Sequence, residues 1–200
     1  MLALPLVLAS RSPARKTLLT RLGLPFDTLS PDIDETPLPD ESPEALVRRL
    51  GQQKAETVAG IRPDHLVIAS DQVALHRNEI LGKPGDTQRA CAQLARFSGQ
   101  SVLFLTSLAL YHPHHGMRLH VEPYRVHFRT LTQDEIYAYI DKEQPFECAG
   151  SFKMEGLGIT LFERLEGDDP TALIGLPLIA LSRLLTEFDC HPLRNTQGNS

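Results

Sequence analysis

Side chains suited to phosphate chemistry first appear in the stretch Ser10-Arg11-Ser12-Pro13-Ala14-Arg15 of this 200-residue chain. The stretch follows an apolar run, residues 4–9, that is typical of a buried strand, and it begins an apolar-periodic helix. Ser12 is placed to cap that helix, and Pro13 fits its first position, where a missing N–H has no cost. The free N–H groups of the first turn favour an anion, and the basic residues add positive charge. An ordinary capped helix with solvated basic side chains is the alternative interpretation.

Three more charged residues have surroundings that favour the same chemistry. Glu35 belongs to an acidic, proline-broken loop, and Asp71 follows an apolar strand, residues 65–69, where open α/β sheets present ligand residues. Lys83 stands between a glycine and a proline, which restrict its backbone. Taken alone, Asp71 also fits a turn and Lys83 an ordinary surface lysine. Together with the helix start they predict a polyphosphate site, which needs cations, a carboxylate for a metal and a base that orients water.

Composition and motifs argue against several other functions. The formal net charge of −5 disfavours a broad nucleic-acid surface, which needs clustered Lys and Arg. The chain has no Gly-x-x-x-x-Gly-Lys-Ser/Thr loop, and no dinucleotide-binding glycine motif opens a helix. His112, His114 and His115 have a spacing that could bind a metal, but a turn without acidic or cysteine partners favours solvated side chains.

Cysteine usage and hydropathy bear on the compartment. The three cysteines are widely spaced, which suits a reducing cytosol and provides no disulfide framework. The apolar run 2–9 lacks a preceding basic residue and is short for a signal peptide, and no later segment approaches the length of a membrane span. We therefore expect a soluble, cytoplasmic protein with neither a membrane nor a nucleic acid as partner.

The elements that must position these residues alternate between helices and strands. Helix signals follow Ser12, Ser42, Thr87 and Thr132, and a last helix is expected over residues 176–188. Strand patterns cover residues 26–29, 65–69, 102–111, 119–130 and 159–165. This order predicts an α/β fold with a mixed sheet flanked by helices. Residues 1–190 are expected to form a single catalytic domain, and residues 191–200 a polar C-terminal tail.

An ordered set of motifs resembles the Maf nucleotide pyrophosphatases over nearly the whole chain. In order, the matching segments are Ala9-Ser10-x-Ser12-Pro13-x-Arg15, Asp34-Glu35-Thr36, Lys54-Ala55, Ser70-Asp71-Gln72, Gly82-Lys83-Pro84 and Ile174-Gly175-Leu176-Pro177-Leu178. Residues 148–156 and 169–173 look like the 7-methyl-GTP branch of that family, whereas the dTTP/UTP branch usually differs there. Such an ordered set is far more specific than any one of its motifs.

The resemblance implies a two-lobed, Maf/ITPase-like fold with a central cleft. It also implies hydrolysis of a nucleoside triphosphate to the monophosphate and pyrophosphate with a divalent metal, Mg²⁺ or Mn²⁺. By the same resemblance, Asp71 would accept a proton and Glu35 would bind the metal, with a metal-ligand role for Asp71 left open. The remaining implied roles are phosphate binding by Ser10, Arg15, Lys54 and Lys83, and base choice by Ala14, Gln72 and Glu155. Members often form dimers, so a homodimer is one expected assembly.

The choice of base has a chemical argument of its own. N7-methylation leaves guanine cationic with N–H donors on its pairing edge, which a carboxylate at Glu155 would match. Phe152 either stacks on that base or packs in the core. Three positions depart from frequent family residues: Ala14 is smaller than an aromatic, Lys16 replaces an Arg and Ser107 a Gly. A dTTP/UTP or broad-specificity pyrophosphatase, and a nucleotide-binding regulator of cell division, remain alternatives.

Overall fold

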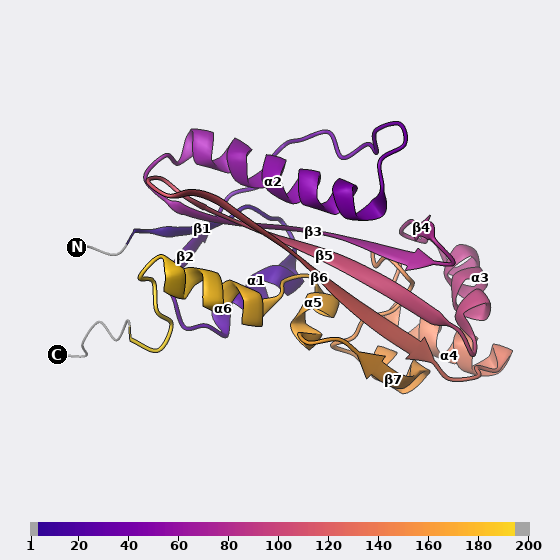
Figure 1. The fold of residues 1–200 in the computed structure, drawn as a ribbon. Coiled ribbons are helices and arrows are strands. Elements are labelled where there is room, and N and C mark those ends of the chain that lie inside the picture. Colours follow the sequence, from indigo (N-terminus) through magenta and orange to yellow (C-terminus); the bar gives the residue numbers. More distant parts are fainter. Residues whose placement is uncertain (1–3, 195–200) are drawn as a thin grey trace. The chain divides into compact units, whose positions relative to one another are not determined.

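The computed structural model describes residues 4–194, and these form a mixed α/β fold (Figure 1). The strands are β1 (Leu6–Leu8), β2 (Phe26–Thr28), β3 (Leu66–His76), β4 (Glu79–Leu81), β5 (Ser101–His112), β6 (Gly116–Phe128) and β7 (Phe162–Glu166). The helices are α1 (Pro13–Thr20), α2 (Pro43–Ile61), α3 (Thr87–Phe97), α4 (Gln133–Glu143), α5 (Pro170–Ile174) and α6 (Leu178–Glu187), with a 3₁₀ helix η1 (Leu157–Leu161).

The strands form one seven-stranded mixed sheet within these residues, in the order β2-β1-β3-β5-β6-β7, with β4 paired to β3. β1 pairs in parallel with β2 and β3, whereas β4 and β7 pair antiparallel with β3 and β6. The predicted mixed sheet flanked by helices is therefore confirmed. No helix among residues 4–194 has both the length and the apolar composition needed to cross a bilayer.

Local capping chemistry accounts for where the helices begin. Ser12 caps α1 by accepting a hydrogen bond from Arg15 N at 3.3 Å, and Ser42 caps α2 in the same way. Thr132 and Glu135 form a complete capping box at α4. The prediction that Thr87 caps α3 is wrong by one residue, because Asp86 accepts the hydrogen bond of the first turn.

The chain divides into two compact units. The first contains the residues up to Gln72, Thr106–Glu122 and those from Gly175 onward, and the second contains Val73–Leu105 and Pro123–Ile174. Of the predicted tail 191–200, residues 195–200 lie outside the described part of the chain.

The first unit is held by α2 packing on its strands. Side chains alternate between the two faces of a strand, so Val7, Ala9, Val67 and Ala69 share a face, and they form one cluster with the small residues of α2. In Figure 1, α2 lies on one side of these strands, and α1 and α6 lie on the other. The buried stripe of α2 thereby fixes which side chains of β3 face this helix.

The second unit has its own aromatic core. Phe97 of α3, Phe104 of β5 and Phe128 of β6 are almost fully buried, and Phe152 packs among them. Phe152 makes edge contacts with Phe104 at 5.4 Å and Phe162 at 4.9 Å between ring centroids. Of the two roles considered for Phe152, stacking on a base and packing in the core, the structure shows packing in the core, because other aromatic rings surround its ring.

Two strand predictions are corrected. β3 does not stop at Ala69 but continues to His76, because the apolar pattern resumes at residues 73–75 and residues 74–76 pair with β4. Asp71 therefore lies within a strand, and an argument from strand ends does not place it. The strand predicted at 159–165 begins as the 3₁₀ helix η1, and β7 starts only at Phe162.

Candidate active site

Side-chain alternation along β3 directs Asp71 toward α2. Val67 and Ala69 share its face and are fully buried in the cluster that includes Ala55 of α2. Lys54 lies on the same buried stripe of α2, and its Nζ is 2.5 Å from Asp71 Oδ1. Asp71 is 9% and Lys54 is 7% exposed, so loss of either partner leaves a largely buried charge uncompensated.

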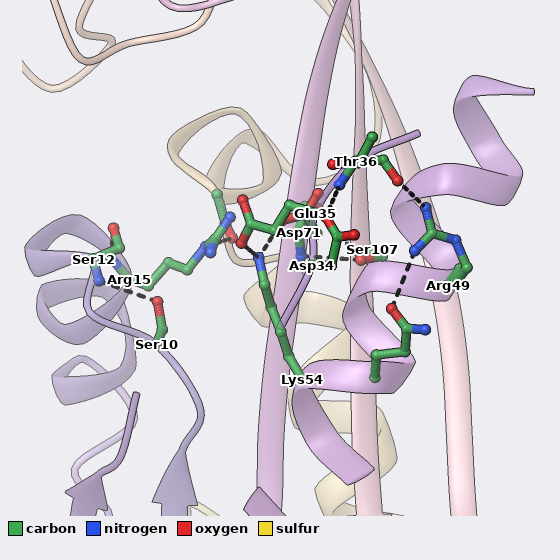
Figure 2. A network of polar contacts seen from close by, with 12 residues as sticks. Ser10, Ser12, Arg15, Asp34, Glu35, Thr36, Arg49, Lys54, Asp71 and Ser107 are labelled. Carbon is green, nitrogen blue, oxygen red and sulfur yellow. Dashed lines mark hydrogen bonds and ion pairs between the residues drawn. The ribbon is translucent and has the colours of Figure 1, made fainter. Parts of the chain in front are cut away.

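Lys54 also holds a second carboxylate. Its Nζ is 2.7 Å from Glu35 Oε1, and the Glu35 side chain is 61% exposed in the loop between β2 and α2. One ammonium group therefore joins two acids that are distant in the sequence, as Figure 2 shows. Such an ammonium neutralises the carboxylates and is a ready partner for phosphate oxygens.

The loop that carries Glu35 is fastened to α2 by Arg49. The Arg49 guanidinium binds Glu41 through Nε at 2.7 Å and Nη2 at 2.8 Å, and donates from Nη2 to Thr36 O at 3.0 Å. The hydrogen bond with Arg49 lowers the pKa of Glu41 to about 2. Asp34 Oδ1 accepts a hydrogen bond from Thr36 N at 2.9 Å, which orders the turn beside Glu35. Sequence reasoning missed Arg49 because no short-range motif links it to this loop.

Arg15 of α1 approaches the same acids (Figure 2). Its Nε donates to Gly175 O at 2.8 Å, and Ser70 Oγ donates to the same carbonyl at 2.7 Å. Desolvation by burial lowers the pKa of Arg15, and the nearby carboxylates of Asp71 and Glu35 oppose that shift. An arginine remains protonated in proteins, so Arg15 adds a positive charge here.

Gly175 is required by its backbone and by its closeness to Arg15. Its φ of 118° lies in a region that side chains disfavour, and an added Cβ would lie 3.3 Å from Arg15 Nε. The sequence motif at residues 174–178 was visible, but its structural role was not. Its carbonyl anchors the guanidinium of a residue 160 positions earlier in the chain.

Ser107 supports the backbone of Asp71. Its fully buried hydroxyl accepts a hydrogen bond from Asp71 N at 3.0 Å, and an added Cβ on Gly51 of α2 would meet that hydroxyl at 2.5 Å. A glycine at 107 would lack this acceptor. No sequence pattern points to this role of Ser107, since the contact joins residues that are 36 positions apart.

The start of α1 offers fewer free donors than predicted. Ser10 Oγ accepts from Ser12 N at 3.1 Å, Ser12 Oγ accepts from Arg15 N, and Ser12 O accepts from Lys16 N. Among the described residues this leaves only the N–H of Ala14 without a hydrogen-bond partner in the first turn. The expectation of several free N–H groups is therefore wrong, because the two serines bond to them.

The other predicted residues have more ordinary surroundings. Gln72 Nε2 donates to Thr106 Oγ1 at 2.9 Å in the first unit. In the second unit, Lys83 Nζ lies 3.3 Å from Glu147 Oε2, with both side chains mostly exposed. Glu155 is exposed in the loop before η1, and the part of the chain that the structure describes provides it with no hydrogen bond or ion pair.

The acids of the first unit fit a divalent cation that arrives with phosphates. No group of three or more His, Cys, Asp or Glu residues within 4–194 is arranged to hold a metal alone. Mg²⁺, however, is commonly bound by one or two carboxylates together with substrate phosphates and water. Glu35 and Asp71 supply such a pair, and both share the Lys54 ammonium.

Comparison with known proteins establishes the family. A model of the Maf-like protein family matches residues 5–188. The chain belongs to the Maf family. Among relatives of this Maf protein, one from Chromohalobacter salexigens is 58% identical over 189 residues, which covers 94% of this chain and 98% of the relative. A relative from Nitrosococcus oceani is 55% identical over 91% of this chain and 92% of its own length. A relative from Vibrio vulnificus is 56% identical over 91% of this chain and 94% of its own length. All three relatives are named 7-methyl-GTP pyrophosphatase.

Solved structures with a similar fold are more distant in sequence. The Staphylococcus aureus Ham1 protein aligns with a TM-score of 0.51 at 12% identity, covering 92% of this chain and 99% of its own. A HAM1 protein from Coxiella burnetii aligns with a TM-score of 0.50 at 16% identity, covering 92% and 100%. These similarities support the predicted fold class.

Proposed function

We propose that this Maf protein hydrolyses 7-methyl-GTP to 7-methyl-GMP and pyrophosphate. The observation that carries the proposal is identity of 55–58% over at least 91% of the chain with three relatives of that name. Removal of modified nucleotides from the pool would be one use of such an activity. The family match over residues 5–188 supports a single catalytic domain over 1–190, and we infer a cytoplasmic location and a homodimer as its assembly.

In the proposed reaction, water attacks the α-phosphorus and the bond from that phosphorus to the bridging oxygen breaks. Pyrophosphate leaves with the bond electrons, and Asp71 accepts the proton from water. Lys54 and Arg15 stabilise the charge that grows on the phosphate oxygens, which is why their convergence on Asp71 supports the assignment. We assign Ser10 and Lys83 to the phosphates as well.

Glu35 and Asp71 would hold the divalent cation, Mg²⁺ or Mn²⁺. When bound, such a cation neutralises phosphate charge as a Lewis acid. Lys54 lies on both carboxylates in this structure, so it would move onto phosphate oxygens as substrate enters. Ala14, Gln72 and Glu155 are assigned to the choice of base, and the negative charge of Glu155 would suit a cationic ring.

A nucleotide panel tests the function directly. Pyrophosphate release is measured for 7-methyl-GTP, GTP, dTTP and UTP, each with Mg²⁺, with Mn²⁺ and with a chelator. We expect the highest kcat/KM for 7-methyl-GTP and no turnover with the chelator. Faster hydrolysis of dTTP or UTP would reject the proposed substrate, and equal rates for all four would indicate a broad-specificity enzyme.

A further inference from the structure

A cavity of about 240 Å³ lies in the second unit, at the β3–β4 hairpin. None of the residues assigned above lines it. Its polar lining residues are His76, Arg77, Asn78, Gln100, Ser101 and Arg125. The lining therefore combines two guanidinium groups with amide and hydroxyl donors, and it contains no carboxylate.

The two arginines of this cavity lack acidic partners. Within the described chain neither Arg77 nor Arg125 forms an ion pair, and Arg77 makes only a long 3.5 Å contact to Gln100 Oε1. The nearest carboxylates by sequence and strand register are engaged elsewhere. Glu79 binds Arg96 at 2.8 Å, and Glu166, opposite Arg125 in the sheet, binds His127 and Arg164. The lining is thus electropositive, although Glu79 also attracts Arg77 at longer range.

His76 is buried beside this cavity with unsatisfied ring nitrogens. It is 2% exposed, packs edge-on against Phe97, and neither Nδ1 nor Nε2 has a hydrogen-bond partner. A neutral imidazole always carries one N–H, so a donor is buried without an acceptor. Burial, with Arg96 and Arg77, lowers the pKa of His76, and the carboxylate of Glu79 opposes that shift.

The turn that carries the cavity also has an unfavourable backbone. Arg77 and Asn78 both have positive φ, 51° and 67°. Asn tolerates this left-handed region, whereas Arg disfavours it, and a two-residue hairpin of this kind usually prefers Asn-Gly. Strained backbone and unpaired buried polar groups concentrate at binding sites, because selection there favours function over stability. Here the turn with positive φ lines the cavity, and the unpaired imidazole of His76 is buried next to that turn.

We propose that this cavity binds a compact phosphate-bearing anion. Two guanidinium groups match the charge and the bidentate geometry of phosphate oxygens, and Asn78, Gln100 and Ser101 add hydrogen-bond donors. The bound anion provides the acidic partner that Arg77 and Arg125 lack within the described chain. The inference does not depend on the proposed function, since it uses no residue of that site. The phosphate source is inorganic phosphate, pyrophosphate or a nucleotide.

The test is a titration of ¹⁵N-labelled protein followed by NMR. Inorganic phosphate, pyrophosphate and 7-methyl-GMP are added separately at constant ionic strength set with chloride. We expect saturable shifts of the Arg77, Asn78 and Ser101 amides with a Kd below about 1 mM for at least one anion. The tightest of the three identifies the source. Absence of saturation at these amides up to about 10 mM for all three anions would overturn the proposal.

Matched variants distinguish specific binding in the cavity from non-specific electrostatic attraction of an anion to the protein. Arg77→Gln and Arg125→Gln should each weaken binding at the hairpin by about tenfold or more. Arg89→Gln should not, because Arg89 is exposed on α3, pairs with Asp86 at 3.4 Å and does not line the cavity. Equal weakening by all three substitutions would show mere electrostatic attraction and reject the site.

Discussion

Replacement of Asp71 by Asn tests the centre of the proposed site. The substitution keeps the shape of the side chain and removes its charge, so Lys54 loses its 2.5 Å ion pair. Lys54 retains Glu35 at 2.7 Å, although that side chain is 61% exposed and therefore a weaker partner. The fold should survive, while the proposed proton acceptor is lost.

The expected magnitudes follow from these contacts. Full loss of a partner for a buried charge costs about 3–5 kcal/mol, but Glu35 still compensates Lys54, so we expect about 1–3 kcal/mol of destabilisation. For a chain of this length, each kcal/mol shifts the melting temperature by about 2–4 °C, so the variant should melt about 2–12 °C lower and remain folded at 25 °C. Turnover should fall by about 10²–10⁴-fold, the usual contribution of a general base.

The assay is pyrophosphate release from 7-methyl-GTP, with a thermal melt of the same samples. Glu56→Gln is the matched control, because it removes one carboxylate from the exposed side of α2, where Glu56 accepts a hydrogen bond from Gln52. We expect the control to keep full activity. An Asp71→Asn protein that is folded at 25 °C and retains more than a few per cent of the wild-type rate would refute the role of Asp71.

Three further outcomes are expected. In the absence of nucleotide, the Lys54→Met variant should bind Mn²⁺ about tenfold more tightly than wild type, since the ammonium no longer covers the two carboxylates. Calorimetry measures the affinity, and Lys54→Arg is the control that preserves the charge. Equal affinities of the wild type and Lys54→Met would contradict the prediction. Glu155→Gln should lower kcat/KM for 7-methyl-GTP more than for GTP, and equal losses would argue against recognition of the cationic base. Glu135→Gln should destabilise the protein at pH 6 but not near pH 2 in denaturant unfolding. The hydrogen bond from Arg129 lowers the pKa of Glu135 from 4.5 to about 2, so its stabilisation is present above pH 4.5 and lost toward pH 2, and a difference that persists at pH 2 would reject this cause.

Local features of the fold were predictable because their causes are local. The Ser12 cap with Pro13 in the first helical position and the Thr132 capping box depend on residues within one turn, and all are present as predicted. The mixed sheet also followed from the order of apolar segments. The end of β3 was misjudged because Ser70, Asp71 and Gln72 interrupt the apolar pattern, while the strand itself continues through them to His76.

Long-range partners could not be predicted from the same information. The attachment of the Glu35 loop through Arg49, the Ser107 hydroxyl on Asp71 N and the aromatic enclosure of Phe152 each join segments whose proximity depends on packing. The residues that flank Ser107 in the sequence are typical of a strand, and those that flank Arg49 are typical of a helix. Their roles become visible only when helix α2 is placed on the sheet.

The sequence by itself determined the family, the order of elements and the identities of the acids and bases, since these depend on residue types and short spacings. Only the tertiary structure decided that Asp71 faces α2 from within a strand, that Lys54 bridges it to Glu35, and that Gly175 holds Arg15. The physical reason is that side-chain direction in a strand alternates with every residue, so which face meets a given helix depends on the packing of the whole sheet.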